Sequence, residues 1–513
     1  MGQTAFMLMI MAVLSKIFGF VREMVMGYYY GTGDIVSIYL VANTIPVIAI
    51  NFIANGIAAG FIPIYNKAKK EKGIEAAEDF TSNLLNITFV FGSIIIAIGM
   101  IFAKPLCMIL SPDLIDRPEL LSMAVVFTRI MMFAVYAYLY SSVFRGYLNL
   151  KGSFFVPVST GIIMNIIIIV FIVLSGIREN AYLLAVGALL GNTLQYIYFP
   201  KASKKYGYKY KFKINKNDYY LKQMLKIAIP IILSVAAAEL ALLVDNAMAS
   251  SFFGNDKISV LNYSKKLLGI IYGVITVSVT TSIYPTISSL ANAGKIDKMK
   301  RKINSSLVSM LALVIPAVVG IMVLSKPVIS LVYERGAFDN DSVIITSAVM
   351  FSYAPYILFT SISDVLDRAF YAVEDSKTPV KIVVIQQIIN IILNLILTRI
   401  IGLTGIAYAT SIACFIGSTL MFISFRKKFG RSNLKRLSIS VLKILAISLV
   451  MGFTARFLYG HLSQSLSGSI ALIITILVAI LVYGILILFA RIPEVMRAVN
   501  KIYHKIKNKK KQK

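Results

Sequence analysis

Three charged side chains lie close together in the first apolar segment of the chain. Lys16, Arg22 and Glu23 fall within a stretch that is otherwise mostly apolar. Ionisable groups inside a membrane span are costly, and they usually face an aqueous cavity and mark function. Lys16 and Glu23 are seven positions apart and share a helix face, whereas Arg22 projects to one side. Because lysine and arginine beside a cavity suit phosphate oxygens, we expect these residues, with Lys266 from a later segment, to bind an anionic substrate.

A second set of polar residues could hold a cation. Asn390 and Asn394 are four apart on one face of an apolar segment, Thr410 lies in the next segment, and Asp245 lies in an earlier one. Their oxygens are hard ligands that suit Na⁺, or a carboxylate that carries a proton, rather than a transition metal. The two asparagines could instead only bond neighbouring helices.

The composition requires a membrane around these segments. Of the 513 residues, 58% are hydrophobic and only 15% are charged, whereas a soluble domain carries about a quarter charged residues. Apolar stretches of roughly 20 residues recur, each long enough to cross about 30 Å of hydrocarbon as a helix. We therefore expect an all-α polytopic membrane protein with about fourteen transmembrane helices. The expected spans are 5–30, 35–66, 80–103, 119–148, 154–175, 180–200, 219–252, 257–290, 303–325, 343–373, 378–400, 402–425, 436–459 and 467–490.

The net charge of +29 lies mainly in short loops between the expected spans. In a soluble protein this charge would suggest a nucleic-acid partner, but its position here indicates topology and contact with anionic lipids. The even-numbered loops and the tail hold most of the lysine and arginine, so the positive-inside rule places both termini in the cytoplasm. Cys107 and Cys414 are far apart and lack a CxxC motif, which gives no readable disulfide or metal framework.

The sequence repeats itself at a shift of 221–223 residues. The matching landmarks are Gly31 with Gly254, Pro63 with Pro285, Asn83 with Asn304, Lys104-Pro105 with Lys326-Pro327, Arg145 with Arg368, and Lys204-Lys205 with Lys427-Lys428. The shift covers six expected spans, an even number, so the two copies have the same orientation and are related by an axis along the membrane normal. Duplicated halves of this kind indicate a transporter whose two lobes rock about a central site.

The repeat predicts the domain organisation. The expected parts are an N-lobe at 1–207, a basic cytoplasmic linker at 208–217, a C-lobe at 218–430, a helix pair at 431–490 and a basic tail at 491–513. At the repeat shift Lys16 falls on Glu239 and Arg22 falls on Asp245. Cations in one copy thus match carboxylates in the other, and we expect the first lobe to hold an anion and the second a cation or a proton.

Several motifs resemble those of the MurJ/MviN lipid II flippases, and the resemblance covers nearly the whole chain. The motifs are residues 15–23 (SKIFGFVRE), 30–33 (YGTG), 42–46 (ANTIP), 61–64 (FIPI), 334–339 (ERGAFD) and 370–380 (FYAVEDSKTPV). The resemblance implies a member of the MOP exporter superfamily that works by alternating access. The implied cargo is an undecaprenyl-pyrophosphate-linked peptidoglycan precursor, carried from the inner to the outer leaflet of a bacterial plasma membrane.

The resemblance also assigns residues. The family's cavity arginines would fall on Lys16, Arg22 and Lys266, and their acidic neighbour on Glu23. The lipid tail would lie in a groove near the C-terminal helix pair, and cell-wall synthesis enzymes are implied partners. Some relatives place Na⁺ in the second lobe, and the residues that would fit are Asp245, Asn390, Asn394 and Thr410.

The chain departs from the family pattern at several cavity positions. Two arginines are lysines here, which keeps the charge but loses the bidentate fork. Ser37, Ile50 and Asn55 stand where the resemblance leads us to expect Asp, Arg and Glu. Another polyprenyl-linked glycan, such as a capsule, teichoic-acid or exopolysaccharide precursor, therefore stays open as the cargo.

Three other functions remain as alternatives. A cation-coupled multidrug exporter should favour acidic and aromatic groups in the first-lobe cavity, and Lys16 and Arg22 argue against it. An enzyme acting on polyprenyl-phosphate sugars often uses a sizeable outer loop, and the odd-numbered loops here are short. A scaffold for cell-wall enzymes would depend on the basic tail and linker more than on a cavity. We expect a transporter rather than an enzyme.

Overall fold

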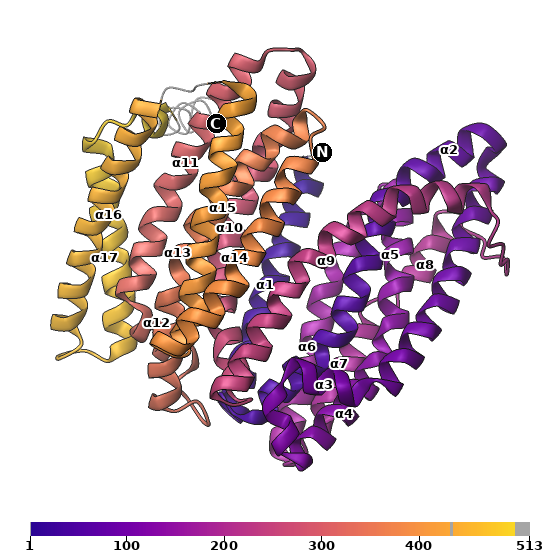
Figure 1. Cartoon of the computed structure of the whole chain (residues 1–513), viewed down its shortest axis with the longest axis horizontal. Coiled ribbons are helices and arrows are strands. Elements are labelled where there is room, and N and C mark those ends of the chain that lie inside the picture. Colours follow the sequence, from indigo (N-terminus) through magenta and orange to yellow (C-terminus); the bar gives the residue numbers. More distant parts are fainter. Residues whose placement is uncertain (1, 431–433, 498–513) are drawn as a thin grey trace. The chain divides into compact units, whose positions relative to one another are not determined.

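The computed structural model describes residues 2–430 and 434–497, with the backbone alone at 2–6, 8–9, 49, 52, 55, 59, 230–242 and 434–436. The parts of the expected basic tail at 498–513 and of the expected helix pair at 431–433 lie outside the described residues. All regular structure in the described ranges is helical, as expected (Figure 1). Eleven of the helices there are long and apolar enough to cross a membrane, and Asp34–Ile48 is a shorter apolar stretch.

The helix bounds follow the expected spans closely. α2 runs through the second and third expected spans as one element, broken at Gly73, whose φ is +84°. The fourth expected span is divided into α4 and α5, and the sixth corresponds to α7, with the short α8 beginning at its end. The principal helices are α1 (Gly2–Tyr30), α2 (Asp34–Ile101), α4 (Pro118–Met132), α5 (Ala134–Leu150), α6 (Phe155–Ile177), α7 (Tyr182–Leu194), α8 (Phe199–Lys205), α9 (Tyr219–Phe253), α10 (Lys257–Asn292), α11 (Ile296–Val323), α13 (Asn340–Ala372), α14 (Lys377–Ile401), α15 (Thr404–Phe429), α16 (Leu434–Leu462) and α17 (Gly468–Phe489).

The chain forms two compact units. Unit 1 comprises Met1–Ser259 with the short segment Arg335–Asp339, and unit 2 comprises Val260–Glu334 with Asn340–Lys513. This division differs from the boundary between the lobes of the sequence repeat. α9, the first span of the expected C-lobe, belongs to unit 1 because it packs along α2.

In unit 1, α2 packs against α4, α5 and α9, while α1 packs against α6. Glycines on α6 allow the close approach of α1. A Cβ at Gly161 would lie 2.1 Å from the Ser15 hydroxyl, and one at Gly176 would lie 1.9 Å from the ring of Tyr29. The first helix is therefore held at a fixed depth and rotation against α6.

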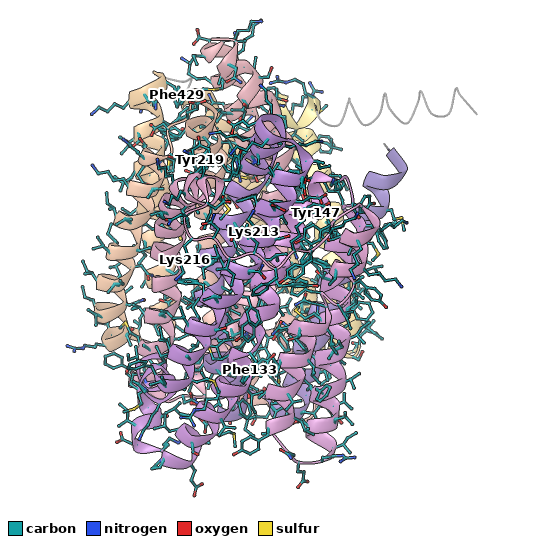
Figure 2. The ribbon with its side chains drawn as sticks, turned by 90° about the vertical axis from the view of Figure 1, so that its right-hand side faces the viewer. Phe133, Tyr147, Lys213, Lys216, Tyr219 and Phe429 are labelled. Atoms are coloured by element: carbon teal, nitrogen blue, oxygen red, sulfur yellow. The ribbon has the colours of Figure 1, made fainter. Side chains whose placement is uncertain are left out.

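The loop between α8 and α9 crosses α2 as an extended segment. The Asn83 side chain donates to the carbonyl of Asn215 at 3.0 Å and accepts from its N–H at 2.7 Å. Lys213 forms a 2.9 Å ion pair with Asp79, and Figure 2 labels Lys213 and Lys216 on this face. The expected linker is thus bound to unit 1 by specific hydrogen bonds.

In unit 2, α15 packs against α13 and α14, and α11 packs against α13 and α16. α16 and α17 form a pair at the edge of this unit (Figure 1). Phe453 and Phe457 on α16 are about three-quarters exposed, at 75% and 73%. Large apolar side chains on an outer helix face are stable when lipid, rather than water, surrounds them.

The backbone repeats at the shift found in the sequence. Gly31 and Gly254 both adopt positive φ at the end of a helix, and so do Gly207 and Gly430. Lys104-Pro105 and Lys326-Pro327 each lie at the start of a short helix, α3 (Ala103–Leu110) and α12 (Ser325–Tyr333) respectively.

Candidate functional site

Arg22 and Glu23 form an ion pair inside α1. The Arg22 Nη2 atom donates to Glu23 Oε1 at 2.6 Å, and the two side chains are 18% and 11% exposed. Tyr39 on α2 and Tyr138 on α5 lie close enough to interact electrostatically with the guanidinium. Helical spacing had placed Arg22 to one side of the Lys16–Glu23 face, but the long side chain reaches its neighbour. The pair gives unit 1 a polar centre within apolar helices.

Contacts with α6 position this part of α1. The Asn165 side chain donates to the backbone carbonyl of Ser15 at 3.3 Å and to Gly161 O at 2.7 Å. Asn165 also lies against Gly19, where an added Cβ would be 3.5 Å from its Nδ2 atom. The helix turn that precedes Arg22 is therefore fixed by polar contacts as well as by close packing.

The two expected lysine ligands have different surroundings. Lys16 is exposed on α1 in unit 1, and Lys266 is exposed on α10 in unit 2. The neighbouring Lys265 lies over the ring of Tyr353, with 4.9 Å from its Nζ atom to the ring centroid. Of the four residues expected to form the substrate site, the structure brings Arg22 and Glu23 together.

Three of the four expected cation ligands form a cluster in unit 2. Asn390 donates from Nδ2 to Thr410 Oγ1 at 3.2 Å, and Asn394 donates to Asn390 Oδ1 at 3.4 Å. Asn390 and Asn394 are 3% and 0% exposed. Asp245 is buried on α9 in unit 1. The three residues of unit 2 supply neutral oxygens only, which suit a hard monovalent cation better than a transition metal.

Sequence reasoning missed Thr398 on the same helix face. Thr398 follows Asn394 by four positions, is 3% exposed, and its Oγ1 has no hydrogen-bond partner among the described residues. The spacing of 390, 394 and 398 was available as a signal, because side chains four apart share a helix face. Within the described ranges, no group of three or more His, Cys, Asp or Glu residues could hold a metal ion.

A second polar cluster, the Asp34 network, joins three loop segments of unit 1. Arg117 donates to both carboxylate oxygens of Asp34 at 2.9 and 2.6 Å. The fully buried Asn255 donates to Asp34 Oδ1 at 3.1 Å and accepts from Ser111 Oγ at 2.7 Å. The segment Arg335–Asp339 joins the same unit through a 2.8 Å hydrogen bond from Ala337 N to Tyr28 O. The network therefore ties together segments that are distant in sequence.

Comparison with protein families assigns the chain to a family. The family model described as lipid II flippase MurJ matches residues 26–478. The chain belongs to the MurJ family. The probable MurJ flippase of Buchnera aphidicola is 28% identical over 418 residues, which is 81% of each chain. The corresponding protein of Thermotoga maritima is 26% identical and covers 93% of each chain.

Solved structures support the same assignment. A MurJ lipid II flippase in an inward closed conformation is 26% identical, covers 94% of this chain and 98% of that chain, and has a TM-score of 0.81. An inward-facing MATE multidrug transporter of the MOP superfamily has a TM-score of 0.67 at 12% identity, which shows a shared fold only. The resemblance expected from the motifs is confirmed. The MurJ family is one of multi-pass membrane transporters, which excludes the enzyme hypothesis.

One departure from the MurJ pattern has a structural role. Ser37, which stands where an acidic residue was expected, is fully buried, and its Oγ accepts from the N–H of Ser259 at 3.0 Å. An aspartate there would bring a buried charge into this contact. The side chain of Asn55 lies outside the described residues.

Proposed function

We propose that the chain moves lipid II, the undecaprenyl-pyrophosphate-linked peptidoglycan precursor, from the inner to the outer leaflet of a bacterial plasma membrane. MurJ-family membership over residues 26–478 supports this proposal. The structural observation that carries it is the Arg22–Glu23 pair, because a buried guanidinium on an apolar helix is suited to an anionic head group.

The pair gives Arg22 a fixed direction before substrate arrives. Glu23 accepts one N–H of the guanidinium, which leaves other donors for phosphate oxygens. Lys16 would add a positive charge from the same helix, and Lys266 of α10 is the remaining cation that we propose for substrate binding. Lysine supplies a point charge without the planar fork of arginine, so Arg22 would orient the diphosphate while the lysines increase its local concentration.

Transport would proceed by alternating access between two lobes of six helices each, with a further helix pair. A topology of about fourteen spans would include three more membrane-crossing segments than the eleven candidate spans. These are α1, α9 and the first part of α2. The lobes would be 1–207 and 218–430, joined by the linker at 208–217. Charge distribution supports cytoplasmic termini and a basic tail at 491–513. The helix pair at 431–490 would guide the lipid tail.

Coupling to Na⁺ or to protons is part of the same proposal. Asn390, Asn394 and Thr410 would supply neutral oxygens, and Asp245 would supply a carboxylate. Cell-wall synthesis enzymes and anionic lipids would be the partners. The cation-coupled multidrug exporter has only the shared fold in its favour. A different polyprenyl-linked glycan remains the second candidate because neutral Ser37, Ile50 and Asn55 stand where three charged residues were expected, so the site has fewer charged groups.

A replacement experiment tests the proposed function. The resident lipid II flippase is depleted in a bacterium, this chain is expressed, and the accessibility of lipid II at the outer face is followed. We expect restored exposure with the native chain, loss with Arg22→Ala, and normal exposure with Arg178→Ala, which removes an exposed arginine next to α6. Normal membrane levels without restoration would instead favour another polyprenyl-linked glycan.

A further inference from the structure

The linker of unit 1 is bound along α2 by polar side chains, and we call these α2 residues the linker seat. Ser82 Oγ accepts from the N–H of Lys211 at 3.2 Å, and Asn86 donates to the carbonyl of Lys213 at 3.0 Å. Asp79 pairs with Lys211 at 3.0 Å and with Lys213 at 2.9 Å. The α2 residues of the linker seat are Asp79, Ser82, Asn83 and Asn86.

One landmark of the repeat borders a cavity in unit 2. Asn83 of the linker seat corresponds to Asn304 on α11. Asn304 lines a cavity of about 280 Å³ together with Arg301 and Ser305 of α11, residues of α16 and residues of the segment after α17. The same landmark asparagine thus binds the linker in unit 1 and borders a cavity in unit 2.

The cavity and the linker seat differ in charge. The linker seat carries Asp79, which pairs with two lysines of the linker, whereas the cavity in unit 2 is lined by Arg301. Arg497 also lines the cavity and pairs with the largely buried Glu494 at 3.0 Å. Two arginines and one glutamate leave the lining with a net charge of +1, which matches the single negative charge of a phosphodiester.

Polar groups in the cavity also match a hydroxylated head group. The buried Oδ1 atom of Asn304 has no hydrogen-bond donor among the described residues. Ser305 and Ser440 add hydroxyl groups to the lining. A ligand with both phosphate oxygens and free hydroxyls could bind the arginines and donate to Asn304 at once.

An apolar groove lies next to this cavity. It has a volume of about 460 Å³, and Leu437 lines both spaces. Leu307 and Leu311 of α11, Phe359 of α13 and Phe415 of α15 contribute to its wall. A charged cavity beside an apolar groove, at the ends of membrane helices, is the arrangement that binds lipid head groups and their chains.

We propose that these two spaces bind one anionic phospholipid, with a phosphodiester and glycerol hydroxyls at Arg301, Asn304 and Arg497 and an acyl chain in the apolar groove. The inference requires only that the chain is a membrane protein, and it does not rest on lipid II transport. The tail at 498–513 carries several lysines and no acidic residue, so its charge disfavours it as the occupant. A polyprenyl diphosphate carries more negative charge than the lining offsets.

The absence of tryptophan from the sequence allows a clean binding assay. Phe415→Trp places a single indole in the apolar groove, and lipids with brominated acyl chains quench it on contact. The full chain is reconstituted in phosphatidylcholine vesicles that contain brominated phosphatidylglycerol or, separately, brominated phosphatidylcholine. We expect brominated phosphatidylglycerol to quench the indole with an apparent affinity roughly tenfold higher than that of brominated phosphatidylcholine. Charge-assisted hydrogen bonds from the arginines would give a difference of this size.

Charge variants test whether the cavity causes this preference. On the Phe415→Trp background, Arg301→Gln with Arg497→Gln should abolish the preference. Lys302→Gln removes one charge from the same turn of α11 without lining the cavity, and it should leave the preference intact. An unchanged preference in the double variant, or equal quenching by both lipids in the parent, would overturn the proposal.

A competition arm identifies the source of the phosphate. Unlabelled undecaprenyl diphosphate is added to vesicles that contain brominated phosphatidylglycerol. Weak displacement supports the phospholipid assignment, whereas displacement at a small fraction of the phosphatidylglycerol concentration would overturn it in favour of the polyprenyl lipid. Synthetic peptide 498–513 serves as a third competitor, and relief of quenching by this peptide would assign the cavity to the tail.

Discussion

Arg22 and Glu23 are sequence neighbours whose side chains meet in a 2.6 Å ion pair within an apolar helix. Adjacent residues on a helix normally point in different directions, about 100° apart. The contact therefore turns the guanidinium toward Glu23. It also fixes the direction of the remaining N–H donors of Arg22. Since both side chains are largely buried, the pair has consequences for stability and for substrate binding that can be measured separately.

The first prediction is a double-mutant cycle on this pair. Removal of one partner leaves an uncompensated buried charge, so Arg22→Ala and Glu23→Ala should each destabilise the protein by about 3–5 kcal/mol. The double variant should lose less than the sum of the two single variants, with a coupling of at least about 1 kcal/mol. Denaturant or thermal unfolding in detergent provides the free energies.

Transport should follow a different pattern from stability in the same cycle. Outer-leaflet exposure of lipid II should be lost in both variants that lack Arg22, including the double variant that regains stability. Arg22→Lys should retain part of the activity because it keeps the charge but not the fork. Normal transport by the double variant would show that Arg22 has no role in substrate binding.

The second prediction concerns Asn255 in the Asp34 network. Asn255→Ala removes the bonds to Asp34 and Ser111 and leaves buried polar groups unsatisfied, so we expect a loss of about 2–3 kcal/mol. The thermal midpoint should fall by several degrees. Asn292→Ala, at an exposed asparagine near the end of α10, is the matched control and should change the midpoint little. Equal midpoints for Asn255→Ala and the native chain would contradict a structural role for the network.

Much of the fold could be predicted from sequence, because hydrocarbon thickness imposes a length on every apolar helix. The expected spans 154–175 and 467–490 correspond to α6 (Phe155–Ile177) and α17 (Gly468–Phe489). Positive φ at Gly31, Gly254, Gly207 and Gly430 follows the sequence repeat, since only glycine adopts this backbone readily.

The missed features depend on side-chain reach and on tertiary contact. Periodicity reports the direction of a Cβ atom, and it could not indicate that Arg22 extends back to Glu23. The packing of α9 on α2 sets a unit boundary that the repeat did not predict. The linker was expected to be a basic loop, but its backbone amides and carbonyls bind Asn83 and Asn86, which no local sequence pattern specifies.

The third prediction is a pH dependence at the loop between α13 and α14. Lys428 donates to Asp375 at 2.5 Å, and Thr378 donates to it from N and Oγ1, which together lower the pKa of Asp375 to about 2. A carboxyl whose folded pKa is depressed stabilises the protein above its unfolded pKa of about 4, and this stabilisation is lost as the pH falls toward 2. Because Lys428 is 38% exposed, we expect a contribution on the order of 1 kcal/mol.

Thermal midpoints of the native chain and Asp375→Asn, measured across this range, test the assignment. The native chain should be more stable at pH 6, and the difference should disappear as the pH approaches 2. Glu374→Gln changes the neighbouring exposed carboxylate and should show no such convergence. A constant difference at every pH would mean that Asp375 acts through packing rather than through its charge.

The fourth prediction distinguishes a cation site from simple helix bonding on α14. If Asn390, Asn394 and Thr410 bind Na⁺, added Na⁺ should stabilise the native chain by mass action, by about 2.7 kcal/mol at a concentration a hundred times the dissociation constant. Asn394→Ala should abolish this Na⁺-dependent increase, because it removes a fully buried oxygen from the cluster. The measurement is the thermal midpoint in NaCl against choline chloride at equal ionic strength.

Thr398→Val provides the matched variant on the same helix face. Its Oγ1 is buried without a described partner, so replacement by an isosteric apolar side chain should preserve or raise the basal midpoint if the hydroxyl only packs. Loss of the Na⁺ response in Thr398→Val would extend the site by one helical turn. An Asn394→Ala variant that is destabilised equally in both salts, while the native chain shows no Na⁺ response, would assign the asparagines to contact between α14 and α15 alone.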